Sequence, residues 1–261
     1  MLIEAAFYKL PDYFQSIESP GELYESQLSF IFATAIFQEL QIRGFSYLLP
    51  YIQVDRPYPE KQYRADIFVK IPKSKLPLEI LYRWAASGVC EKNWIEVKFF
   101  GGAERKKGSE AKTRNLGKIL EALLRLKFYV REGGKYLLMV FNRLPRYYLP
   151  LKEREYVECF LRNGRDTIMV DFSKEPKTVI NCIRDKSLRD LVKKKNQVEF
   201  NLQKYSIEPI VTRGLLTPPK SEPPKRSRNG IWLVSEPQYY FYLLRILELE
   251  NEEYRRGAEK P

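Results

Sequence analysis

Two strongly β-forming runs of this chain carry charged residues in their middle. Asp66 lies in the run 63–69 (Tyr-Arg-Ala-Asp-Ile-Phe-Val), and Glu96 and Lys98 lie in the run 94–100 (Trp-Ile-Glu-Val-Lys-Phe-Phe). Because strand side chains alternate between faces, Glu96 and Lys98 point the same way, and the apolar residues between them point into a core. Charges in so apolar a strand are costly unless a partner compensates them. A divalent cation would compensate the carboxylates and a phosphate the lysine, so these residues predict metal-dependent phosphodiester chemistry.

The composition favours a globular protein with a polyanionic partner. Of 261 residues, 44% are hydrophobic and 14% aromatic, which is enough to bury a core. The chain carries 45 Lys and Arg against 33 Asp and Glu, a net charge of +12, which suits nucleic acid. A basic chain can also be merely soluble or lie on an anionic membrane, so charge alone does not decide the partner.

Several classes of function are excluded by what the chain lacks. It has no histidine, which excludes histidine general bases, Ser-His-Asp triads, HNH-type nucleases and most zinc enzymes. Its cysteines, Cys90, Cys159 and Cys182, form no CxxC pair and predict reduced thiols in a cytoplasmic protein. The N-terminus does not resemble a signal peptide, and no apolar run approaches the ~20 residues of a membrane span, so we expect no membrane association.

The hydrophobic pattern predicts the elements that must position the charged residues. A helix is expected at about 20–42, where Ser19 caps, Pro20 takes the first position and Glu22 closes a capping box. Strands are expected at about 46–54, 63–70, 93–100 and 135–141, with a helix at about 110–129. Further expected elements are a short helix around 78–86, a helix at 151–162, a strand at 167–172, a basic helix at 176–194, a strand at 198–210 and a closing helix at about 236–256.

This order of helix, three strands, helix and strand resembles the PD-(D/E)XK nuclease superfamily. The resemblance rests on Asp66, preceded by Ala65 where the family has proline, on Glu96-Val97-Lys98 as the E-x-K motif, and on a helical glutamate upstream. It covers about residues 20–142. The E-x-K tripeptide gains specificity because it lies in a hydrophobic strand thirty residues after the strand-borne Asp66.

The resemblance implies an α/β (α+β) fold with a restriction-endonuclease-like core, a mixed central β-sheet flanked by helices in the order αβββαβ. C-terminal helical and strand additions would follow this core. We expect a nuclease domain at 1–205, a Pro-rich basic linker or loop at 206–230, and a C-terminal helix at 231–261.

The chemistry of phosphodiester cleavage explains the residue types. Hard Mg²⁺, for which Mn²⁺ can substitute, prefers oxygen ligands, so Asp66, Glu96 and the backbone carbonyl of Val97 are the expected ligands. Lys98 would orient the attacking water, lower its pKa and balance charge on the phosphate. For the helical glutamate, Glu25 lies three residues before an inward-facing leucine, whereas Glu22 already has a role in the capping box and is the reserve.

Each of these assignments has a structural alternative. Asp66 could pair with Arg64 or Lys70, and Glu96 with Lys98 could form an ordinary ion pair on a half-exposed strand. Phosphate contacts are expected at the start of the 110–129 helix, where a solvated basic loop is the alternative; the residues are Arg105, Lys106, Lys107, Lys112, Arg114 and Asn115. The tyrosines at 147–148 and 239–242 could stack bases or could pack in a core or dimer contact.

The leading functional expectation is a Mg²⁺-dependent endonuclease acting on double-stranded DNA, most like a type II restriction enzyme. The resemblance implies products with 5′-phosphate and 3′-hydroxyl ends, and cutting both strands implies a homodimer. A junction-resolving, repair or RNA-directed nuclease on the same fold is the alternative enzyme. A non-catalytic nucleic-acid-binding subunit is the alternative from another class.

Overall fold

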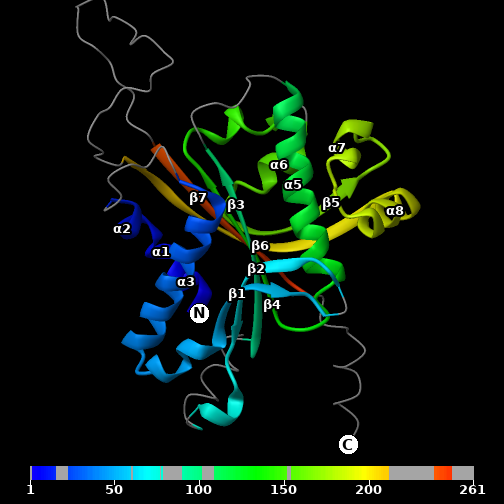
Figure 1. Ribbon diagram of the computed structural model, residues 1–261. Coiled ribbons are helices and arrows are strands. Elements are labelled where there is room, and N and C mark those ends of the chain that lie inside the picture. The colour runs from blue at the N-terminus through cyan, green and yellow to red at the C-terminus, as the bar shows by residue number, and fades with distance from the viewer. Residues whose placement is uncertain are drawn as a thin grey trace, which may run out of the picture.

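The computed structural model describes residues 2–15, 23–59, 61–76, 78, 90–101, 109–151, 154–211 and 238–248. A seven-stranded mixed sheet runs through its centre with helices on both faces, so the fold is α/β (Figure 1). The strands follow the order β1-β2-β3-β4-β7-β6-β5 across the sheet.

The elements fall into an N-terminal helical group, a central strand group and a C-terminal group. The helices are α1 (Leu2–Tyr8), α2 (Leu10–Gln15), α3 (Glu25–Ile42), α5 (Ser109–Phe128), α6 (Glu155–Cys159), α7 (Lys177–Asn181) and α8 (Lys186–Lys195), with 3-10 turns η2 (Ser46–Tyr51), η3 (Lys73–Lys75) and η4 (Pro145–Tyr147). The strands are β1 (Ile52–Pro57), β2 (Arg64–Lys70), β3 (Lys92–Phe100), β4 (Gly134–Phe141), β5 (Gly164–Asp171), β6 (Gln197–Val211) and β7 (Gln238–Ile246).

Strand β3 lies in the interior of the sheet. It pairs antiparallel with β2, where Ile67 lies opposite Ile95, and parallel with β4, where Glu96 lies opposite Leu137. Helix α5 makes the crossover between the two parallel strands, as parallel pairing requires. With strands on both sides and helices on both faces, β3 is buried almost throughout, and its residue Glu96 sits deep in the protein.

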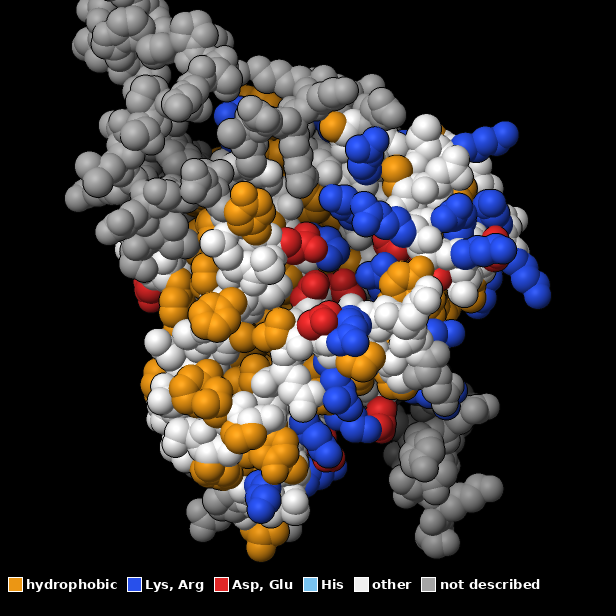
Figure 2. Space-filling model, viewed as in Figure 1, with side chains coloured by type: hydrophobic (Ala, Val, Ile, Leu, Met, Phe, Trp, Pro, Cys, Tyr) orange, Lys and Arg blue, Asp and Glu red, His pale blue; other side chains and the backbone are white. Residues whose placement is uncertain are grey.

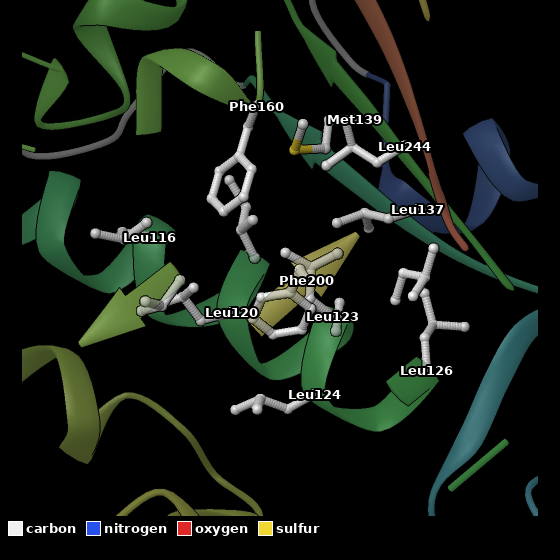
Figure 3. Close-up of a cluster of buried hydrophobic side chains, with 14 of the residues drawn as sticks. Leu116, Leu120, Leu123, Leu124, Leu126, Leu137, Met139, Phe160, Phe200 and Leu244 are labelled. Carbon is white, nitrogen blue, oxygen red and sulfur yellow. The ribbon is translucent and has the colours of Figure 1, made fainter. Parts of the chain in front are cut away.

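Two hydrophobic cores sandwich the sheet. On one face α1, α2 and α3 pack against inward residues of β2 and β3 such as Val97. On the other face α5 packs a leucine stripe against the sheet and the C-terminal elements, and Figure 3 shows the labelled members of this cluster: Leu116, Leu120, Leu123, Leu124, Leu126, Leu137, Met139, Phe160, Phe200 and Leu244.

Most elements of the first half are confirmed, with shifted ends. The strands expected at 63–70, 93–100 and 135–141 are β2, β3 and β4, and the helix expected at 110–129 is α5. The first long helix begins at Glu25, where the backbone N–H of Tyr24 donates to Gln27 Oε1 over 2.8 Å. The expected capping box at Ser19–Glu22, most of the expected helix at 78–86 and the basic loop at 102–108 lie outside the described residues.

The closing helix expected at about 236–256, the C-terminal helix of 231–261, is wrong for the segment that the structure describes there. That segment is β7, and it pairs with β4 on one side and β6 on the other. Tyr239, Phe241 and Leu243 enter one core, while Tyr240 and Leu244 enter the other. A continuous apolar run suits either a helix or a strand covered on both faces, and burial by both cores selects the strand.

Four other predicted elements differ in type or extent. Residues 46–51 form η2 instead of a strand, and Pro50 in this segment has no N–H to donate to a sheet. The basic helix expected at 176–194 is split into α7 and α8, because Asp185 caps α8 by accepting from the N–H groups of Ser187 and Leu188. The helix expected at 151–162 shortens to α6, and β6 continues to Val211, past the expected start of the linker at 206. None of the described helices is long and apolar enough to cross a membrane.

Helices α5 and α7 approach closely at Gly117. A methyl carbon at this position would overlap Cβ of Cys182 and come within 3.0 Å of the Val179 carbonyl oxygen. We expect Gly117→Ala to destabilise the protein by about 1–3 kcal/mol through overpacking, although alanine is the better helix former. Urea unfolding measures this difference, and Arg114→Ala, on an exposed position of the same helix, should stay within about 0.5 kcal/mol of wild type. Equal stability of the two variants would contradict the close approach.

Candidate active site

Three carboxylates converge on the ammonium group of Lys98. Its Nζ lies 3.0 Å from Glu25 Oε1, 3.5 Å from Asp66 Oδ2 and 3.6 Å from Glu96 Oε2. It also donates to the backbone carbonyl of Val97 over 2.6 Å. The structure therefore brings together all four predicted charged residues from α3, β2 and β3, although Glu25 and Lys98 are 73 positions apart.

Sheet register places the strand residues of this cluster. The pairing of Ile67 with Ile95 brings Asp66 beside Glu96 on the neighbouring antiparallel strand. The backbone N–H of Val97 donates to Asp66 Oδ2 over 2.6 Å, which fixes one oxygen of this carboxylate. The geometry thus follows from the alternation of two adjacent strands.

Glu25 enters the site from the other direction, at the first turn of α3. Its Oε1 accepts from Lys98, and its Oε2 lies 3.4 Å from the backbone N–H of Phe99. Side-chain exposure falls from 43% for Glu25 and 28% for Asp66 to 1% for Glu96. The cluster is therefore open to solvent at the Glu25 end and closed behind Glu96.

Two further residues, Tyr58 and Arg125, hold the buried carboxylate of Glu96 and were not predicted from the sequence. The Tyr58 hydroxyl donates to Glu96 Oε1 over 2.6 Å, and its ring stacks on Trp94. Arg125 Nη1 lies 4.0 Å from Glu96 Oε2, with its guanidinium over the Tyr63 ring. The available signal was an arginine within the otherwise apolar inward stretch of α5.

The cluster contains more carboxylates than cations, since three acidic side chains surround Lys98. The pKa of Glu96 is raised to about 7, chiefly because the carboxyl is buried; Lys98 opposes this effect and the charge of Asp66 adds to it. Burial likewise raises the pKa of Asp66, against the attraction of Lys98. Burial alone would lower the pKa of Lys98, but the three surrounding carboxylates outweigh it and raise that pKa. Burial therefore favours the protonated forms of Glu96 and Asp66, and the nearby cations offset this effect only in part.

The donor set of this cluster fits a hard divalent cation. Asp66, Glu96 and the Val97 carbonyl offer only oxygen atoms, and Mg²⁺ typically takes one or two carboxylates and retains several waters. Within the described part of the chain, no group of three or more His, Cys, Asp or Glu side chains is arranged to hold a metal ion. A cation here would thus depend on two carboxylates, the backbone carbonyl and water, with Glu25 on the open side.

The contacts of Asp66, Glu96 and Lys98 differ from those of the structural ion pairs that were the alternatives. Arg64 bonds Asp55 on β1, with 3.2 Å between Nη1 and Oδ2, whereas the ion pair of Asp66 is with Lys98. Glu96 and Lys98 do face each other, but in a buried position instead of on a half-exposed strand. An ordinary surface ion pair therefore does not describe them.

Of the six residues expected to contact nucleic acid, three are not described by the structure and the other three differ in burial. Arg105, Lys106 and Lys107 lie outside the described residues. On α5, Arg114 is exposed and Lys112 half-buried, whereas Asn115 is buried and donates to the Tyr148 carbonyl over 3.2 Å. Burial therefore corrects the expectation for Asn115, because its amide is occupied inside the protein and cannot reach a phosphate.

The tyrosines for which stacking and core packing were the alternatives differ in exposure. Tyr147 is exposed, whereas Tyr239 and Tyr240 are buried in the two cores, so core packing describes the latter pair. Figure 2 shows the acidic side chains gathered at the centre of one face, with Lys and Arg side chains beside them and over α5 and α8. The carboxylate cluster thus opens next to a basic surface.

Comparisons of the chain with protein-family models, with curated proteins and with solved structures find no match.

The raised pKa of Glu96 gives a pH-dependent prediction for Mg²⁺. A carboxyl whose folded pKa exceeds its unfolded value stabilises the fold at low pH, and this contribution is lost as the pH rises from about 4.5 to 7. Since Mg²⁺ needs the ionised carboxylates, it should raise Tm more at pH 8 than at pH 6. Thermal unfolding with Mg²⁺ and with EDTA measures the difference, which Asp66→Asn should remove and Asp55→Asn should preserve. Equal Mg²⁺ shifts at the two pH values would contradict a site built on Glu96.

Proposed function

We propose that this protein is a Mg²⁺-dependent nuclease that hydrolyses phosphodiester bonds of double-stranded DNA. The observation that carries the proposal is the convergence of Glu25, Asp66 and Glu96 on Lys98 Nζ, all within 3.6 Å. The order α3-β1-β2-β3-α5-β4, with antiparallel, antiparallel and parallel strand pairing, supports a restriction-endonuclease-like core within the larger sheet.

Stability alone does not account for such a cluster. Removing carboxylates from water costs several kcal/mol per ion, and well-packed apolar residues would do as well or better in an interior strand. Groups with pKa values shifted by burial and by a specific charged partner concentrate at functional sites. The cost of burying Glu96 and Asp66 beside Lys98 is therefore best explained by catalysis.

Each residue of the cluster has a distinct role in the proposed hydrolysis. Asp66, Glu96 and the Val97 carbonyl would hold Mg²⁺, which when bound neutralises phosphate charge and lowers the pKa of water. Lys98 donates to a phosphate oxygen and stabilises the negative charge that grows as water attacks phosphorus. Glu25 orients the Lys98 ammonium and, as the most exposed carboxylate, can accept a proton from the attacking water. Cleavage of the P–O3′ bond then leaves 5′-phosphate and 3′-hydroxyl ends.

The substrate is assigned from charge and from the open side of the cluster. The net charge of +12 and the basic surface beside the acidic residues favour a polyanion that approaches from the Glu25 side (Figure 2). A restriction or defence endonuclease of type II is the form of this activity that we propose. It predicts discrete DNA fragments, whereas a structure-directed or RNA-directed enzyme would require junction or RNA substrates.

Replacing site residues should abolish cleavage without unfolding the protein. Asp66→Asn keeps an oxygen for the Val97 N–H but removes the charge, and Lys98→Met removes the ammonium, so each should lower the cleavage rate by at least about 1,000-fold. Plasmid and phage DNA incubated with Mg²⁺ or EDTA and read on a gel measure this loss. Asp55→Asn, which removes an exposed ion pair of the neighbouring strand, is the matched control and should cleave normally. Cleavage retained by Asp66→Asn would refute the assignment.

Tyr58→Phe tests the support of the buried carboxylate. The variant keeps the ring stacked on Trp94 but loses the hydrogen bond to Glu96, so Glu96 is held less firmly. We expect about a 10-fold to 100-fold slower reaction and a higher Mg²⁺ concentration for half-maximal rate. Titration of the cleavage rate with Mg²⁺ measures both quantities. A lower rate with an unchanged Mg²⁺ requirement would place Tyr58 outside the support of the metal ligands.

A further inference from the structure

Helix α3 presents to solvent an uncharged face with several large apolar side chains. Tyr24 just before its first residue, Phe30 on its second turn and Ile42 at its end are 68%, 69% and 70% exposed. Exposed Gln27 and Gln38 lie on the same side, since positions three and four apart on a helix are neighbours. The outer face of α3, defined as residues 24, 27, 30, 31, 34, 38, 41 and 42, therefore forms one continuous stripe without a charged side chain.

The charged residues within α3 are used elsewhere. Glu25 bonds Lys98 in the site, and Glu39 is buried between Lys9 and Arg43. The inward side of the helix is apolar too, with residues such as Leu28 and Phe32 in the core. The outer side combines uncharged polar side chains with large apolar ones, and within the described structure those apolar side chains remain exposed.

The apolar surface continues beyond α3 onto η2 and β1. Tyr47 and Leu49 on η2 are each 48% exposed, and Val54 on β1 is 52% exposed. Helix α3 packs against both η2 and β1. Figure 2 shows orange side chains along the side of the molecule that carries α3, opposite the basic side chains over α5 and α8. Single exposed apolar residues are ordinary, but a contiguous patch marks an interaction surface.

The absence of charge on this face decides the kind of partner. Nucleic acid binds through Lys and Arg, which the outer face of α3 does not contain, so DNA belongs to the other side of the molecule. Amphipathic membrane-binding helices likewise carry Lys and Arg on their polar face. A second copy of the chain brings another +12 charges, and an uncharged face is where two such molecules meet with least repulsion.

The dimensions and residue types also suit contact between two copies. An 18-residue helix is roughly 27 Å long, which matches the side of a standard interface patch of about 800 Å² per partner. Tyrosine and phenylalanine are enriched in such interfaces, and glutamines can bond across a two-fold axis. Since a two-fold contact uses the same patch on both molecules, one self-complementary stripe is sufficient.

We propose that the outer face of α3, with the adjoining residues of η2 and β1, is the contact surface of a two-fold symmetric homodimer. The inference does not depend on the nuclease activity, because it rests on exposure and charge alone. Glu25 opens α3, so the helix at the dimer contact also carries a residue of the carboxylate cluster.

Molecular mass in solution tests the proposal. Sedimentation equilibrium of the purified chain at micromolar concentrations should give twice the chain mass of 31.0 kDa. Phe30→Arg and Gln38→Arg each add a positive charge to the proposed contact surface of both copies and should weaken association by at least about 100-fold. Met169→Arg is the matched control, because Met169 on β5 is an exposed apolar residue away from α3, and this variant should dimerise like wild type.

The three substituted side chains are exposed, so each variant should fold, and circular dichroism verifies that it does. A change in molecular mass then reports on the contact between copies and not on misfolding. Wild type at the mass of one chain over the whole concentration range would overturn the proposal. Dimers that persist in both Phe30→Arg and Gln38→Arg would overturn it too, because the contact would then lie elsewhere. A wild-type monomer that sediments with anionic phospholipid vesicles would replace the second copy by a membrane surface.

Discussion

The structure depends on one buried ammonium group. Lys98 is the common partner of Glu25, Asp66 and Glu96, and it projects from the interior strand β3, where an unpaired charge would cost several kcal/mol. The arrangement is stable only because α3, β2 and β3 each contribute an acid to the same point. It remains unbalanced, since three acids surround one lysine with Arg125 behind them, and this excess of negative charge is what suits the cluster to a divalent cation.

The back of the cluster is anchored through a chain of polar contacts to the C-terminal half. Arg125 lies beside Glu96 and bonds Glu121 on the same helix over 2.8 Å. Glu121 also accepts from the backbone N–H of Asp185, and Asp185 accepts from the Tyr129 hydroxyl while capping α8. The additions after β4 are therefore not separate from the cluster, because they fix the helix that supports its buried carboxylate.

Charge is divided between the surfaces of the molecule. Basic side chains cover the side over α5 and α8, acidic side chains gather at the centre, and apolar side chains are frequent on the side that carries α3 (Figure 2). Such a division would allow the proposed polyanionic substrate and the proposed second copy of the chain to bind at different surfaces. Helix α3 takes part in both surfaces: Glu25 at its first position belongs to the carboxylate cluster, and the outer face of the helix is exposed to solvent.

The sequence by itself determined the strands β2 and β3, the helix α5 and most of α3, because these follow from local alternation and periodicity. The grouping of Glu25 with Asp66, Glu96 and Lys98 was predicted from the resemblance to a nuclease family, since Glu25 and Lys98 are 73 positions apart. Only the tertiary structure decided that 238–246 is a central strand, that Tyr58 and Arg125 hold Glu96, and that Asn115 is buried. The apolar run of β7 satisfies a helix as well as a strand until two cores cover it. Tyr58 lies 38 positions from its partner, and no local pattern encodes a hydrogen bond over that separation.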